Sequence, residues 1–90
     1  PINITKEINR ELSINTFPNP SNGIINVAVK GNLDDGFRYR VINLSGQIVE
    51  EGKETYKRQL KLDLSDRMSG IYLVEVQTTE KKISKRVVIN

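Results

Sequence analysis

Apolar residues recur at every second position along most of this 90-residue chain, and this alternation constrains the fold more than any other feature. Ile25, Val27 and Val29 alternate with polar or small residues, and residues 60–64 repeat the pattern with Leu. Period two is the repeat of a β-strand that buries one face. Gly, Pro, Asn, Asp and Ser interrupt the alternation about every eight to twelve residues, as short antiparallel strands require.

The pattern predicts an all-β domain rather than a helical bundle or a βαβ unit. We expect seven strands, over residues 12–16, 24–30, 37–44, 47–55, 59–64, 70–78 and 82–89. Seven short strands in so small a chain favour a seven-stranded antiparallel immunoglobulin-like β-sandwich. The side chains expected to face its core are Ile25, Val27, Val29, Phe37, Tyr39, Val41, Leu60, Leu62, Leu64, Tyr72, Val74 and Val76.

The first eleven residues differ from the rest, because they show neither sustained alternation nor a complete helical stripe. We interpret residues 1–11 as the end of a linker and residues 12–90 as one folded domain, a length within the common range for a domain. Since the chain begins with Pro rather than Met, we expect it to be part of a longer protein.

Composition argues against catalysis. The chain has no Cys and no His, so it lacks thiolate ligands, the usual general base and the commonest metal ligand. We therefore predict a protein that is not an enzyme and that has no cofactor, metal or catalytic residue. No stretch approaches the ~18 apolar residues of a membrane helix. Nucleic acid is not expected as a partner, because three Tyr and two Phe form no evident stacking platform.

The segment from Phe17 to Gly23 is the most distinctive local feature, since it contains Pro18, Asn19 and Pro20. Each Pro fixes its own φ and biases the preceding residue toward extended conformations. Gly23 can adopt positive φ before the next strand. Two interpretations remain open: a stiff connection between strands, or a preformed shape that a partner recognises.

Other turns have simpler explanations. Gly46 lies between two strand-like runs and predicts a tight hairpin turn. Asp34, Asp35 and Gly36 predict a second one. A calcium site at this Asp pair is disfavoured, because the alternating carboxylates of a cation-binding loop are missing.

The last two predicted strands carry further signals. Tyr72 and Val74 fit the tyrosine corner of immunoglobulin-like sandwiches, in which a Tyr bonds back to the upstream backbone. Lys85 and Arg86 lie in a Lys-rich last strand. These cations either discourage edge-to-edge association or form a basic patch for an acidic glycan or a lipid head group.

Four segments in this order resemble the C-terminal sorting domain of type IX secretion cargo: residues 17–23, 41–49 and 62–74 and the Lys-rich last strand. The resemblance covers about residues 12–90. The resemblance implies that the domain directs its parent protein from the periplasm through an outer-membrane translocon to the cell surface or the medium. It also implies removal by a sortase-like peptidase, with a cut within or before residues 1–11 and attachment of the cargo to the surface. The chain departs from the family at Asn43, where an acidic residue is common, and at its end, which is not Lys.

Carried over residue by residue, the resemblance implies recognition elements in the Pro-rich segment, the hairpin, the sixth strand and the terminal strand. They are Pro18, Asn19, Pro20, Gly23, Gly46, Gly70, Tyr72, Lys85 and Arg86. The alternative hypothesis is an accessory carbohydrate-binding or adhesion module, with Tyr56 and Arg58 as candidate contacts.

Overall fold

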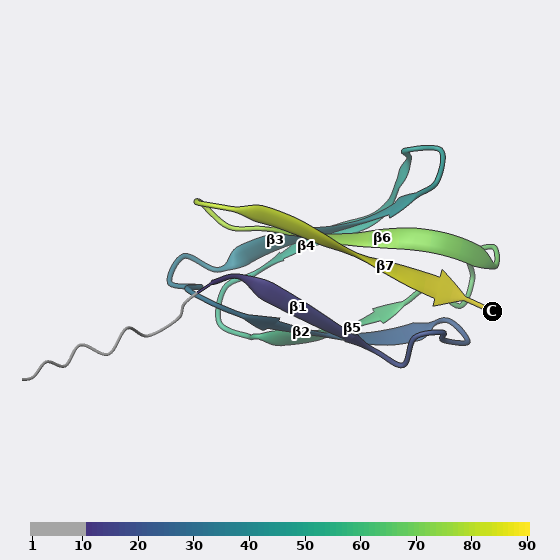
Figure 1. Cartoon of the computed structure of the whole chain (residues 1–90), viewed down its shortest axis with the longest axis horizontal. Helices are drawn as coiled ribbons and strands as arrows, with labels where there is room; N and C mark the ends of the chain where they lie inside the picture. The colour runs from purple at the N-terminus through teal and green to yellow at the C-terminus, as the bar shows by residue number, and fades with distance from the viewer. Residues whose placement is uncertain (1–10) are drawn as a thin grey trace, which may run out of the picture.

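The computed structural model describes residues 11–90, which form seven strands and no helix (Figure 1). The strands are β1 (Ser13–Phe17), β2 (Ile24–Lys30), β3 (Phe37–Asn43), β4 (Ile48–Glu54), β5 (Gln59–Asp63), β6 (Gly70–Gln77) and β7 (Lys82–Ile89). The predicted linker lies outside the described residues, apart from Glu11. No helix in the described part of the chain is long and apolar enough to cross a membrane.

The strands form two antiparallel sheets that face each other, in the orders β1-β2-β5 and β4-β3-β6-β7 (Figure 1). Every hydrogen-bonded pair of strands within them is antiparallel. This arrangement is that of an immunoglobulin-like sandwich in which the fourth strand joins the second sheet. The predicted fold class is therefore confirmed.

The core lies between the sheets and is built from alternating residues of both. Ile25, Val27 and Val29 of β2 are fully buried, as are Val74 and Val76 of β6 across the core. The predicted inward sets are confirmed, with Tyr39 and Leu60 only partly buried beside the core. The other buried apolar residues are Leu12, Leu33, Phe37, Val41, Leu62, Leu64, Tyr72, Val87 and Ile89.

The strand ends follow the chemistry of the flanking residues. The predicted bounds of β2 and β7 agree with the structure, and the other bounds differ by one residue at one or both ends. β1 extends to Phe17, which still pairs with Asn26 of β2. It ends there because Pro18 has no N–H to donate to the ladder.

The predicted hairpin turn at Asp34, Asp35 and Gly36 is wrong. A tight turn is present, in which the Gly36 N–H donates to the Leu33 carbonyl at 2.8 Å. The strands on either side, β2 and β3, belong to different sheets, so the turn carries the chain from one layer to the other. Local turn chemistry sets the tightness of a turn but does not specify which sheet the next strand joins.

The strand directions gather the connections at two ends of the sandwich. We call one end the motif end; it comprises residues 18–23, 44–47 and 64–69 together with Asn90 (Figure 1). Leu12 and the connections over residues 31–36, 55–58 and 78–81 lie at the opposite end. Strands of seven or eight residues separate the two ends by about 25 Å.

Candidate recognition face

The connection between β1 and β2 is hydrogen-bonded to the last strand of the other sheet. The Asn19 side-chain amide donates to the Arg86 carbonyl and accepts from the Val88 N–H, both at 3.0 Å. The Ser21 N–H donates to the Val88 carbonyl at 2.9 Å, and its carbonyl accepts from the Asn90 N–H at 2.8 Å. Two segments almost seventy residues apart in sequence are thereby joined into one unit.

This geometry is compatible with both interpretations of the Pro-rich segment, a stiff connection and a preformed surface shape. The segment connects two paired strands, as a stiff linker would. It also presents Pro18, Asn19 and Pro20 on the surface in a shape fixed by β7. The peptide bonds preceding both Pro residues are cis.

Ser21 and Gly23 form the buried base of this segment. The Ser21 side chain is only 2% exposed; its hydroxyl donates to the Ile24 carbonyl at 2.8 Å and accepts from the Gly23 N–H at 2.9 Å. Gly23 has φ +126°, and a Cβ there would lie 2.7 Å from Ser65 Cα. The Gly23 carbonyl accepts from the Leu64 N–H at 2.7 Å, so this close backbone approach ties the segment to β5.

The hairpin between β3 and β4 turns at Gly46, as predicted. Gly46 has φ +88°, and its N–H donates to the Asn43 carbonyl at 3.0 Å. The Asn43 side-chain oxygen accepts from the N–H groups of Ser45 and Gln47, at 3.0 and 2.9 Å. An Asp oxygen can accept the same bonds, so the departure from the family pattern at Asn43 preserves the turn.

Gly70 and Tyr72 open β6, and Gly70 pairs with Ile89 of β7. The Tyr72 ring is 5% exposed, and its hydroxyl donates to the Met68 carbonyl at 2.5 Å. This bond is the predicted tyrosine corner. Because the ring lies in the core, Tyr72 shapes the motif end from inside and offers a partner little surface.

We expect Tyr72→Phe to lower the free energy of unfolding by about 1 kcal/mol, because it leaves the Met68 carbonyl without this donor. Tyr39→Phe is the matched control, since the Tyr39 hydroxyl makes no hydrogen bond with the described residues; its effect should stay within about 0.5 kcal/mol. Urea denaturation measures both values. Equal effects would contradict the role assigned to the Tyr72 hydroxyl.

Lys85 and Arg86 lie on β7, and their side chains are exposed on opposite faces of the sheet, as neighbours on a strand must be. Arg86 is opposite Leu73 of β6, and Lys85 is opposite Val74. The two cations therefore do not form one patch. The structure instead engages the Arg86 backbone, through Asn19.

An exposed carboxylate, Asp63, orders the chain where β5 ends. It accepts the Ser65 hydroxyl at 2.5 Å and the Ser65 N–H at 3.0 Å. These two hydrogen bonds, the side-chain bond being the stronger cause, lower the pKa of Asp63 below its usual value. The ionised form therefore holds Ser65 in place beside Gly23 at neutral pH.

Exposed apolar side chains concentrate at the motif end. Leu44 and Met68, on two of its turns, are 74% and 83% exposed. Three more, Phe17, Ile24 and Ile48, lie at adjoining strand ends, and Leu73 lies further along β6. Tyr56 is the exception among the large exposed apolar residues of the described chain, because it lies at the opposite end.

Comparison with known protein families shows which family the chain belongs to. Residues 15–90 match the family model described as the secretion system C-terminal sorting domain. The chain belongs to this family. The match covers all nine predicted recognition residues and every strand except the first two residues of β1. No curated protein matches the chain.

A type IX sorting domain is a signal for export to the cell surface or for secretion, and it implies interaction with the type IX machinery. The family is not one of enzymes. The predicted recognition residues include exposed Pro18, Asn19 and Pro20 but not buried Ser21. Its burial and its bonds to β7 could not be inferred from alternation, although its place directly after the Pro-Asn-Pro segment was a usable signal.

Proposed function

We propose that the type IX translocon recognises this sorting domain at its motif end. The supporting observation is that three motif segments, the end of β7 and most of the exposed apolar side chains of the described residues lie together there. Pro18, Asn19 and Pro20 would be contacted directly, as would the hairpin turn at Gly46. Buried Gly23 and Tyr72 and partly buried Gly70 shape that surface, and Lys85 and Arg86 add one positive charge to each face of β7 beside it.

The position of the preceding chain agrees with this proposal. Leu12 is buried at the opposite end of the sandwich, so the chain enters the folded domain at the end away from the motif end. We further propose that the cargo crosses the periplasm and that a sortase-like peptidase cuts upstream of Leu12. The cargo would then be attached to the cell surface.

The alternative binding module gains no support from its candidate residues. The Arg58 guanidinium donates to the Gly31 carbonyl at 3.1 Å, and the Arg58 carbonyl accepts from the Val29 N–H at 2.8 Å. Arg58 thus has a structural role beside exposed Tyr56. A sorting signal accounts for the motifs more completely.

A fusion tests the sorting role. We expect residues 1–90, placed behind a reporter that carries an inner-membrane export signal, to bring the reporter outside a type IX-competent cell. The same fusion in a strain without the translocon, and the reporter without the domain, should remain in the periplasm. Periplasmic retention of a stable fusion in the competent strain would contradict the proposal.

The same experiment tests cleavage separately. Exported reporter should lack the domain when its mass is measured. Exported reporter that retains residues 11–90 would contradict peptidase removal and leave the sorting role intact. Lys85→Gln/Arg86→Gln in the fusion tests the terminal cations without removing buried Val87 and Ile89, which a truncation would remove.

A further inference from the structure

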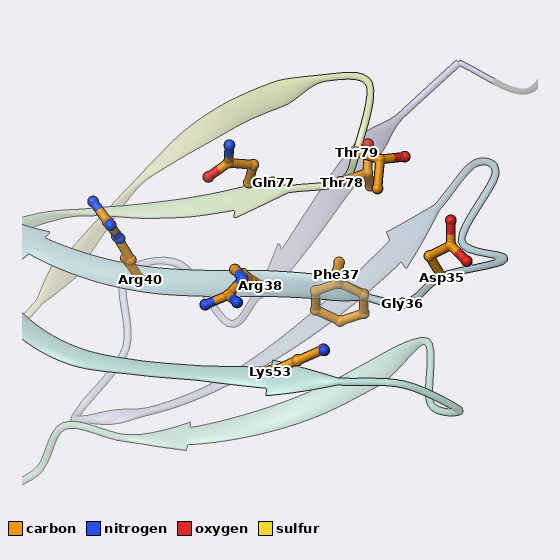
Figure 2. Close-up of a pocket in the computed structure, with 9 residues that line it drawn as sticks. All are labelled: Asp35, Gly36, Phe37, Arg38, Arg40, Lys53, Gln77, Thr78 and Thr79. Atoms are coloured by element: carbon orange, nitrogen blue, oxygen red, sulfur yellow. The ribbon is translucent and has the colours of Figure 1, made fainter.

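A basic groove lies on the outer face of the second sheet, near the end opposite the motif end (Figure 2). Its volume is about 580 Å³. Arg38 and Arg40 of β3 and Lys53 of β4 contribute its cations (Figure 2). No motif residue of the sorting signal lines it, so the sorting function leaves it unexplained.

The strand register places like charges side by side. Arg38 is directly opposite Lys53 on β4 and opposite Gln77 on β6, which is in turn opposite Lys82 on β7. Directly opposed side chains have Cβ atoms about 5 Å apart, and like charges so placed repel each other. The row of directly opposed residues across β4, β3, β6 and β7 thus contains three cations and no acid: Lys53, Arg38, Gln77 and Lys82.

The charges of Arg38 and Lys53 are not neutralised within the described chain. Arg40 forms an ion pair with Glu51, with 3.8 Å between Nε and the carboxylate oxygen. The side chains of Arg38 and Lys53 make no ion pair or hydrogen bond with any described residue, and both are exposed. Two adjacent free cations suit a ligand with oxyanion groups, since guanidinium and ammonium bind carboxylate and phosphate.

The rest of the groove can bind hydroxyl groups. Gln77 and Thr79 line it together with Asp35, so an amide, a hydroxyl and a carboxylate group lie beside the cations (Figure 2). The Thr78 hydroxyl also lies at the groove but is already hydrogen-bonded within its own turn. The Phe37 ring at its base is 2% exposed and offers no surface on which a nucleic-acid base could stack. We propose that this groove binds an anionic sugar, with its carboxylate or phosphate groups on Arg38 and Lys53 and its hydroxyls on the flanking polar side chains.

Calorimetric titration of the 90-residue chain tests the site at low salt. The probes are trigalacturonate, which carries carboxylates, fructose 1,6-bisphosphate, which carries phosphates, and neutral maltotriose. We expect at least one anionic sugar to bind and maltotriose not to bind. The anionic sugar that binds with the lower dissociation constant identifies the oxyanion that the groove prefers. Its affinity should fall as the salt concentration is raised.

Arg38→Gln/Lys53→Gln should weaken binding of the anionic sugar at least about tenfold, which is a loss of about 1.4 kcal/mol. Lys57→Gln/Lys61→Gln removes the same charge from exposed positions outside the groove and should change affinity less than about twofold. Thermal melts of both variants should match the parent, which excludes unfolding. Absence of binding, equal weakening in both variants, or binding of maltotriose would overturn the site.

Discussion

Replacing Gly23 by Ala is expected to lower the free energy of unfolding by about 2–5 kcal/mol. Two energetic costs add. The first is the conformational cost of a positive φ, which L residues rarely adopt, and is about 1–2 kcal/mol. The second is the steric cost of a Cβ placed 2.7 Å from Ser65 Cα. Overpacking of this kind costs about 1–3 kcal/mol. The contact is with backbone, so no side-chain rotation relieves it.

Gly46→Ala separates the two costs. Gly46 also has positive φ, but a Cβ there would meet no atom within 4 Å. It should therefore cost about 1–2 kcal/mol, the conformational part alone. Denaturant unfolding of both variants gives the difference. If Gly23→Ala is no more destabilising than Gly46→Ala, the close approach of the Pro-rich segment to Ser65 does not constrain the fold.

Much of the fold can be predicted from the sequence because alternation reports burial directly. The inward residues of β2 and β6 follow from period two, and Pro18 marks the end of β1 by its missing N–H. The turn at Gly36 was predicted as a hairpin because its chemistry is local. The sheet that a strand joins depends on packing between layers, which alternation does not encode.

The candidate recognition face is less predictable from the sequence than the fold. Gly46 and Tyr72 have local signatures, a tight turn and a tyrosine corner, and both are confirmed as structural elements. The bonds from Asn19 and Ser21 to β7 join segments almost seventy residues apart and have no periodic signal. The clustering of Leu44 and Met68 with those segments follows from strand direction and becomes evident only once the topology is known.

The sorting role itself rests on the family match rather than on the sandwich, because similar alternation would fit many β-sandwich modules. The proposed recognition at the motif end adds a location to that role. It predicts that the surface of the motif end, and not exposed apolar area in general, determines export.

Leu44→Ser/Met68→Ser in the reporter fusion is expected to reduce export at least about tenfold, because it removes two apolar contacts that each provide up to about 3 kcal/mol when buried by a partner. Both side chains are already exposed in the folded domain, so the variant should melt as the parent does. Tyr56→Ser is the matched control, since it removes a side chain that is 95% exposed at the opposite end.

The deciding measurement is the ratio of external to periplasmic reporter for these two variants and the parent, with each folded domain verified by thermal melting. Recognition at the motif end predicts a large loss for Leu44→Ser/Met68→Ser and parental export for Tyr56→Ser. Parental export by a folded Leu44→Ser/Met68→Ser domain, or an equal loss in Tyr56→Ser, would contradict it.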